Sequence, residues 1–360
     1  MHPRVESFPT PRPDYRRFLA AVRRQGAGAV PLIELALDPE VVAALLEEAL
    51  PATDEEAGRR ALAEQTVRLL YRLGYDVVKM SAPMPFEIRR LGAEDTAPLS
   101  RGQRQWQDQH HGCITSLDDL ARFRRPAGSE ADFAAFEAAC RMLPDGMALL
   151  GFCGGVLELT CDLLGLEQFL YAVYDAPELV AAVIDHVGQT VYEVFEIYCQ
   201  MEACCALWLG DDLGSKNGLL VSPDWLRQHV FPWYRRYVEL AHRQGRPFLL
   251  HSCGNISAVL PDLIDEVGID AKHSFEDAIL PVEQFIDRWG DKVGTLGGID
   301  VDLLARGPEQ AVVARTRQVL EHAAPRRGYA CGSGNSITNY VPPDNYLAMV
   351  ETVARFNGRR

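Results

Sequence analysis

The sequence predicts an α/β protein built as a (β/α)8 barrel with an N-terminal helical extension. Short apolar runs, typical of strands buried on both faces of a parallel sheet, alternate with longer amphipathic stretches along the chain. Eight such runs occur, and none is joined to the next by a turn typical of an antiparallel hairpin. A doubly wound sheet is the weaker prediction, because no G-x-G-x-x-G motif follows the first run.

Each predicted strand is an apolar run bounded by glycine, proline or polar residues. In chain order the eight strands are residues 29–35, 75–80, 146–153, 204–209, 247–253, 269–273, 293–296 and 328–331. The alternation of these strands with helices predicts one barrel domain over residues 1–360, of which residues 1–28 are the N-terminal extension.

Helices are predicted where apolar residues recur at helical spacing. Ser222 followed by Pro223 marks one helix start, Asp175 ahead of Pro177 marks another, and Gly74 marks a helix end. The predicted helices are residues 14–24, 39–50, 55–73, 131–142, 163–171, 177–201, 222–244, 258–267, 282–289, 308–323 and 345–356.

Residues 81–125 are predicted to be a long loop with short helical pieces that covers the barrel mouth. Such a length is more than a connection between two elements needs, which favours a functional cover. Trp106 in this loop is a candidate substrate contact, although a loop packed by its own aromatic side chains is the simpler alternative.

Composition excludes several classes of function. Lys and Arg number 36 against 50 Asp and Glu, a net charge of −14, and no basic run suggests a nucleic-acid partner. The N-terminal residues do not resemble a signal peptide, and no apolar run is long enough for a membrane span. Nine cysteines in a chain of this length do not predict a disulfide framework. We expect a cytoplasmic protein.

Polar side chains gather where the predicted strands end, which is where (β/α)8 barrels carry their active sites. These residues are Glu158, Asp211, Asp212, His251, Cys253, His273, Glu276, Asp300 and Cys331. Asp211 and Asp212 are candidate catalytic residues that bind substrate, or alternatively anchor the turn that Gly210 and Gly214 frame. His273 is a candidate substrate contact.

His251 and Cys253 are separated by one residue on the fifth predicted strand, so both project to one face while Ser252 turns away. Together with Cys331 they offer three ligands that suit Zn²⁺, with either Glu276 or Glu158 as a fourth. Two thiolates neutralise the metal and make it a weak Lewis acid, which favours activation of a thiol or of a methoxy oxygen over peptide hydrolysis.

Several motifs together resemble the uroporphyrinogen decarboxylase superfamily. They are His251-x-Cys253-Gly254-Asn255, the turn 210–214 followed by Ser222-Pro223, Gly298-Ile299-Asp300, and the tail 331–337 running into 341–345. The metal-type positions resemble the zinc-dependent corrinoid methyltransferase branch, which comprises methylcobamide:coenzyme M methyltransferases and the methyltransferase I components of O-demethylases. This resemblance implies a (β/α)8 barrel, zinc held by His251, Cys253 and Cys331, and a separate corrinoid protein that docks at the barrel mouth.

The decarboxylases of the superfamily need no metal and hold their porphyrinogen with an arginine signature near the first strand. Arg23-Arg24 precedes that strand here, and Asn335, a candidate substrate contact, stands where decarboxylases carry a histidine. We therefore expect a zinc methyltransferase that moves a methyl group between a small methoxy compound or thiol and a corrinoid protein. The alternatives are a metal-free decarboxylase and a non-catalytic, zinc-stabilised partner protein.

Overall fold

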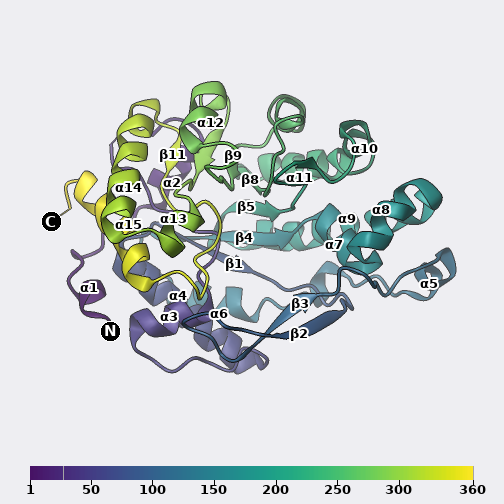
Figure 1. The fold of residues 1–360 in the computed structure, drawn as a ribbon, viewed down its shortest axis with the longest axis horizontal. Helices are drawn as coiled ribbons and strands as arrows, with labels where there is room; N and C mark the ends of the chain where they lie inside the picture. The colour runs from purple at the N-terminus through teal and green to yellow at the C-terminus, as the bar shows by residue number, and fades with distance from the viewer. Residues whose placement is uncertain (27, 360) are drawn as a thin grey trace.

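A parallel sheet of seven strands forms the centre of the computed structural model, which describes residues 1–26 and 28–359. In spatial order the strands are β1 (Val77–Ser81), β4 (Ala148–Gly154), β5 (Cys204–Gly210), β8 (Phe248–His251), β9 (Ala271–His273), β10 (Gly294–Leu296) and β11 (Tyr329–Ala330). Every neighbouring pair is parallel, and Figure 1 shows β1, β4, β5 and β8 following one another in this order. Seven of the eight predicted strands are confirmed.

The first predicted strand, residues 29–35, is not a regular strand of this sheet. Its residue Leu32 forms an isolated parallel bridge with Cys331, next to β11. The amide of Ile33 donates to the carbonyl of Cys331 at 2.9 Å, and the amide of Cys331 donates to the carbonyl of Pro31 at 2.8 Å. The segment therefore continues the sheet beyond β11, while β1 forms the opposite edge.

The sheet is curled, because side chains from all of its strands meet in one interior cluster. This cluster contains Ile33, Leu35, Val77, Leu150, Ala206, Trp208, Leu249, Ala271, Leu296 and Ala330, together with Phe18 and Val22 of α2 (Tyr15–Val22). Alternate residues of a strand point to opposite faces, so one residue in two faces this interior. Helix α2 contacts β10 and β11 and belongs to the interior core.

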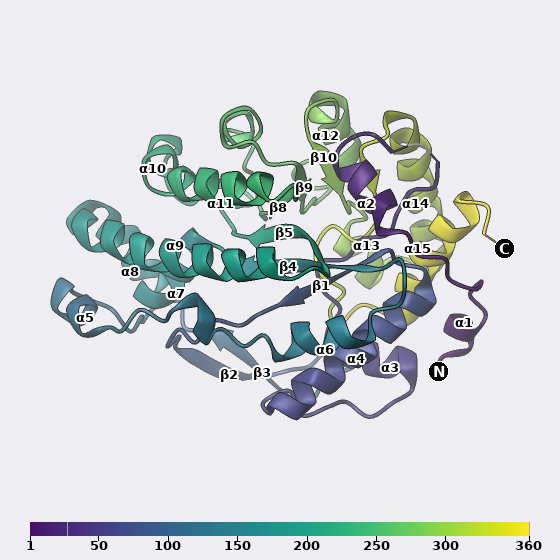
Figure 2. The same cartoon turned by 180° about the vertical axis from the view of Figure 1, so that it is seen from behind.

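Helices surround the sheet (Figure 2). A larger core cluster of buried side chains lies between the sheet and the helices. The remaining helices are α1 (Pro3–Glu6), α3 (Pro39–Leu46), α4 (Glu56–Leu73), α5 (Leu117–Arg122), α6 (Ala134–Met142), α7 (Val156–Leu164), α8 (Leu166–Asp175), α9 (Pro177–Gln200), α10 (Pro223–His229), α11 (Phe231–Arg243), α12 (Val282–Trp289), α13 (Val301–Arg306), α14 (Glu309–Ala323) and α15 (Pro343–Phe356), with a π-helical turn at Asp262–Val267. No helix in the described part of the chain combines the length and the apolar character that a membrane crossing requires.

The predicted helix end at Gly74 and helix start at Ser222 are confirmed, but other predicted helix boundaries are wrong. The predicted helix 222–244 is divided at Val230 into α10 and α11. The predicted helix 163–171 is divided between α7 and α8 at Gly165, whose φ of +80° is left-handed and interrupts the helix. Asp175 is the last residue of α8 and makes no cap for α9. Ser222 caps α10 as predicted, because its hydroxyl oxygen accepts a hydrogen bond from the Trp225 amide at 3.2 Å.

The predicted loop 81–125 contains an antiparallel hairpin, formed by β2 (Arg90–Glu94) and β3 (Gln103–Gln107). A smaller antiparallel pair, β6 (Gly214–Ser215) with β7 (Gly218–Leu219), follows β5. The prediction that the chain has no hairpin is therefore wrong. Arg104 of β3 donates to Asp38 and to Asn339, at 3.2 Å in each case. Both partners follow segments that end at the carboxyl edge of the sheet, so the hairpin is attached to that edge.

Candidate metal centre

Three possible metal ligands converge at the carboxyl ends of β5 and β8. The ligand atoms of Asp212, His251 and Cys253 all lie within 4.8 Å of one another. In the parallel pairing of these strands Gly210 is opposite His251. Asp212 and Cys253 are each two residues further along, and alternation returns both side chains to the interior face. Ser252 points away, as predicted, and its hydroxyl accepts from the Leu213 amide at 3.1 Å.

The distances between these atoms fit a tetrahedral ion. Zinc bonds of about 2.0–2.3 Å at tetrahedral angles separate two ligand atoms by roughly 3.4–3.6 Å. Nε2 of His251 lies 3.3 Å from Sγ of Cys253 and 3.7 Å from Oδ1 of Asp212. The backbone amide of Cys253 also donates to Oδ1 of Asp212 at 2.8 Å, which ties the two strand ends together. The chemistry and the spacing of this donor set fit Zn²⁺.

Hydrogen bonds behind His251 assign the direction of its lone pair. Nε2 of His273 lies 3.3 Å from the carbonyl oxygen of Ser333, and Nδ1 of His273 lies 2.7 Å from Nδ1 of His251. A carbonyl oxygen only accepts, so Nε2 of His273 carries the proton and its Nδ1 accepts from Nδ1 of His251. Burial lowers the pKa of both rings, that of His273 to about 3, so each is neutral. Nε2 of His251 therefore presents a free lone pair toward Cys253 and Asp212.

The sulfur of Cys253 receives two hydrogen bonds. Nδ2 of Asn335 lies 3.1 Å from it, and the Ser274 hydroxyl lies 3.4 Å from it. Burial, together with the nearby carboxylate of Asp212, raises the pKa of Cys253 to about 12, so the thiol stays protonated unless a cation is bound. The two donors would stabilise a thiolate once a metal has displaced the proton.

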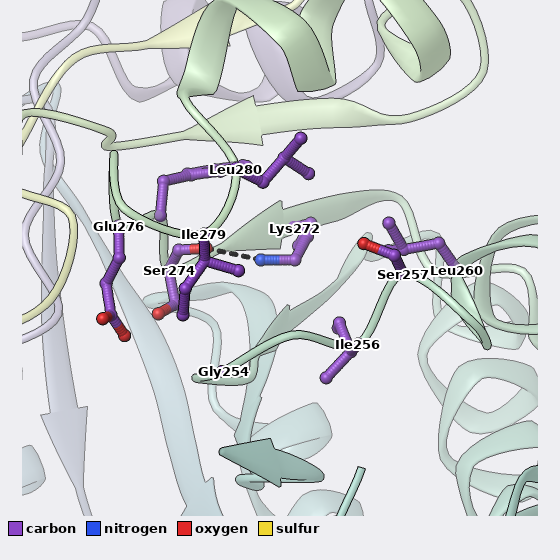
Figure 3. A pocket seen from close by; sticks show the side chains of 10 residues that line it. Gly254, Ile256, Ser257, Leu260, Lys272, Ser274, Glu276, Ile279 and Leu280 are labelled. Atoms are coloured by element: carbon purple, nitrogen blue, oxygen red, sulfur yellow. Dashed lines mark hydrogen bonds between the residues drawn. The ribbon is translucent and has the colours of Figure 1, made fainter. Parts of the chain in front are cut away.

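A buried lysine holds the turn that carries Ser274. Ser274 has a left-handed φ of +85°, which is strained for a residue with a side chain. Lys272 donates to the carbonyl oxygens of His273 and Ser274, and Figure 3 shows its amine pointing at the Ser274 carbonyl. Because β9 side chains alternate, Lys272 acts from the outer face of the sheet while His273 faces the interior.

Asp211 anchors a helix, which is the structural alternative considered for it from the sequence. Its carboxylate accepts from the amides of Leu157 and Glu158 at 3.0 and 2.8 Å and from the Tyr234 hydroxyl at 2.6 Å. The two amides belong to the first turn of α7, where such groups lack partners within the helix. A Cβ at Gly155 would lie 2.0 Å from Cγ of Asp211, so this close approach requires glycine. A catalytic role for Asp211 has no support in this geometry.

Cys331 does not join the cluster. Its neighbour Ala330 faces the interior, so the Cys331 side chain faces outward and is fully buried in the core between sheet and helices. There it lies near Tyr329 and Glu34, and burial raises its pKa to about 12. The curled sheet therefore lies between Cys331, the third predicted ligand, and the pair His251 and Cys253. Asn335, which was predicted as a substrate contact, contacts the Cys253 sulfur instead.

The remaining predicted residues lie outside the cluster. The side chains of Glu158 and Glu276 are exposed, and neither carboxylate belongs to the group of converging ligand atoms. Trp106 on β3 is 57% exposed, with its ring 5.6 Å from the Arg104 guanidinium. Sequence reasoning did not single out Ser274 or Lys272. For Asp212 the sequence did contain a signal. Asp212 lies two residues after Gly210 of β5, just as Cys253 lies two residues after His251 of β8, so both side chains return to the same face.

Comparisons with known proteins now place the chain in a family. The model described as "Uroporphyrinogen decarboxylase (URO-D)" matches residues 17–356. The chain belongs to the uroporphyrinogen decarboxylase family. A uroporphyrinogen decarboxylase of Geobacter metallireducens is 25% identical over 258 residues, covering 68% of this chain and 72% of that protein. A methylated-thiol--coenzyme M methyltransferase of Methanosarcina mazei is 31% identical over 187 residues, covering 52% of this chain and 47% of that protein.

Solved structures with a similar fold include a methyltransferase from Methanosarcina mazei. Its TM-score is 0.69 at 19% identity, and the match covers 94% of this chain and 98% of the other. A putative vitamin-B12 independent methionine synthase from Listeria monocytogenes matches with a TM-score of 0.51 at 12% identity, covering 92% and 98% of the two chains. These likenesses concern the fold, and they agree with the curled parallel sheet of this chain.

Proposed function

We propose that this member of the uroporphyrinogen decarboxylase family is a zinc-dependent methyltransferase, which moves a methyl group between a small methoxy compound or thiol and a corrinoid protein. The observation that carries the proposal is the convergence of the His251 lone pair, the Cys253 sulfur and the Asp212 carboxylate at one strand edge. The similarity to the methylated-thiol--coenzyme M methyltransferase of Methanosarcina mazei supports the same class of reaction.

In this proposal His251, Cys253 and Asp212 hold the zinc. One thiolate and one carboxylate give the same charge balance as the two thiolates expected from the sequence, so the metal is again neutralised. When bound, such an ion would lower the pKa of a substrate thiol or polarise a methoxy oxygen. The fourth position is left for the substrate, and a corrinoid protein would dock on the carboxyl edge of the sheet.

The protein side chains around these ligands have positioning roles. His273, fixed by the Ser333 carbonyl, keeps the His251 ring in one tautomer and one orientation. Asn335 and Ser274 donate to the Cys253 sulfur, so they withdraw charge from a thiolate and hold it in place. This arrangement excludes rotation of the ligands when substrate enters.

A metal-free decarboxylase is the competing proposal, favoured by the uroporphyrinogen decarboxylases among the relatives. A porphyrinogen with several carboxylates would meet the carboxylate of Asp212, whose Oδ1 lies 3.7 Å from Nε2 of His251 at the candidate metal centre. A carboxylate at this position favours binding of a cation over binding of a polyanion.

The metal content of two cysteine variants tests the proposal. We expect one zinc per wild-type chain, loss of zinc and of methyl transfer in Cys253→Ala, and retention of both in Cys331→Ala, measured by atomic emission and by transfer from methoxy and thiol compounds to a corrinoid protein. Zinc-free wild-type protein that releases CO₂ from uroporphyrinogen would support the decarboxylase. Bound zinc whose removal unfolds the chain, without methyl transfer to any corrinoid protein, would support the non-catalytic alternative.

A further inference from the structure

A cavity of about 320 Å³ opens between the segment that follows the first extended run and the end of β1. β1 is an edge strand of the sheet, and the cavity lies beside this edge. Helix α4 covers the outside of the cavity. Most of the lining is apolar and includes Leu35, Leu37, Leu62, Leu70, Met80 and Pro83. The volume lies at the lower end of the roughly 300–1,000 Å³ of small-molecule pockets.

Lys79 of β1 also lines this cavity, and its charge sets it apart from the apolar lining. It is partly buried, and the described residues give its ammonium neither a hydrogen bond nor an ion pair. Its nitrogen lies 4.2 Å from the centre of the Phe152 ring. Burial lowers the pKa of Lys79 to about 8, which still leaves most of it charged at neutral pH. A charge removed from water without a partner is costly, so the site favours an anion.

The other charged groups of the cavity do not cancel the charge of Lys79. Arg59 and Asp132 form an ion pair at 2.6 Å, and Arg59 also donates to the Asp54 carbonyl at 2.9 Å. Burial raises the pKa of Glu34 to about 8, so its carboxyl group is mostly neutral at pH 7, and it contacts Ser333. Lys79 is therefore the unbalanced charge at the inner end of an apolar cavity.

We propose that this cavity binds a small organic anion with an apolar body, whose carboxylate or sulfonate group pairs with Lys79. The apolar body would displace water from the leucine and methionine side chains, and the anionic group would supply the partner that the ammonium lacks. This inference concerns binding alone and does not depend on the proposed methyl transfer.

Aromatic contacts connect Lys79 to the metal centre. The Phe152 ring meets Trp208 edge to face at 6.2 Å between ring centres, and Trp208 meets His273 in the same way at 5.3 Å. His273 in turn contacts His251. An anion bound to Lys79 would thus be connected to the metal ligands through the interior side chains of Phe152, Trp208 and His273. If the proposed methyl transfer also holds, the methyl donor or acceptor is an organic anion of this kind.

Calorimetric titration with benzoate tests the proposal, with benzyl alcohol as the neutral probe of similar shape. We expect wild-type protein to prefer benzoate, Lys79→Met to bind benzoate about tenfold or more weakly and to lose the preference, and Lys79→Arg to keep it. Lys292→Met is the matched control, because Lys292 is exposed and paired with Asp265. Its affinity should equal that of the wild type.

Two further arms separate this site from the metal centre and from misfolding. Leu62→Trp should fill the cavity and remove benzoate binding while circular dichroism stays unchanged. The affinity should persist after chelation of bound metal, because Lys79 is the anion's partner. Benzoate binding that is lost on chelation, unaffected by Lys79→Met, or no tighter than that of benzyl alcohol would overturn the proposal. Methyl transfer is not a readout in any arm, so failure of the proposed function would leave this result standing.

Discussion

The orientation of His251 depends on two residues that the linear sequence does not connect to it. His273 lies on the neighbouring strand β9, and Ser333 follows β11. Together they form a chain of hydrogen bonds that ends in an acceptor without a proton of its own, and this fixes the tautomer of both rings. The tautomer and orientation of a candidate ligand such as His251 are therefore set by its hydrogen-bond partner as well as by its own chemistry.

Replacement of His273 tests this arrangement. His273→Leu removes the acceptor for Nδ1 of His251, so we expect zinc affinity to fall about 10- to 100-fold. His273→Gln retains an acceptor and should keep most of the affinity. Competition with a chromophoric chelator measures both, with His322→Leu on the surface as the control. Equal zinc affinity in His273→Leu and the wild type would show that the His251 ring needs no such support.

At the element scale, the turn after β5 gives two adjacent aspartates different tasks. Strand alternation sends Asp211 outward to the first turn of α7 and Asp212 inward toward His251. The same dipeptide thus joins the sheet to a helix and contributes to the candidate metal centre. Successive side chains point to opposite faces of the sheet, so neighbouring positions after β5 send one carboxylate outward and the other inward.

Alanine substitutions should separate these two tasks. Asp211→Ala leaves two helix amides and the Tyr234 hydroxyl without partners, so we expect the free energy of unfolding to fall by about 2–4 kcal/mol. Asp212→Ala removes one accepted hydrogen bond and should change stability by about 1 kcal/mol or less, but should weaken zinc binding. Urea denaturation and metal titration measure the two effects. The reverse pattern would assign the metal to Asp211.

At the scale of the whole molecule, helix α2 is part of the interior core of the curled sheet. Its residues Phe18 and Val22 are fully buried in the interior cluster, next to side chains of the sheet strands. They lie at the amino ends of the strands, opposite the metal centre, since α2 packs on β10 and β11 near Gly294. The residues described from the sequence as an extension therefore include a helix that fills the interior of the curled sheet at the amino ends of its strands.

Truncation of the Phe18 side chain in α2 should destabilise the whole domain. Phe18→Ala empties a fully buried position, so we expect a loss of about 3–5 kcal/mol in the free energy of unfolding. Phe356→Ala, at a side chain that is 40% exposed, is the control and should cost less than about 1 kcal/mol. Thermal or urea unfolding measures both. A Phe18→Ala variant as stable as the control would mean that the packing of α2 contributes little to the stability of the sheet.

The sequence alone predicted most of this architecture, because buried parallel strands and amphipathic helices leave local patterns that need no knowledge of neighbours. It also placed His251 and Cys253 on one face and Ser252 on the other, since alternation within one strand is fixed by covalent geometry. It did not predict the β2–β3 hairpin, whose residues are largely exposed and polar and so lack the alternation that marks a half-buried strand.

Only the tertiary structure decided which ligands meet. Tyr329, Ala330 and Cys331 are all apolar or weakly polar, so their order carries no signal for which of them faces the interior. Pairing with β10 and with Leu32 decides which of these side chains face the interior, and it turns Cys331 outward. The same pairing brings Asn335 to the Cys253 sulfur. Local chemistry placed two candidate soft-metal ligands at the end of β8, and the register between strands brought Asp212 to them.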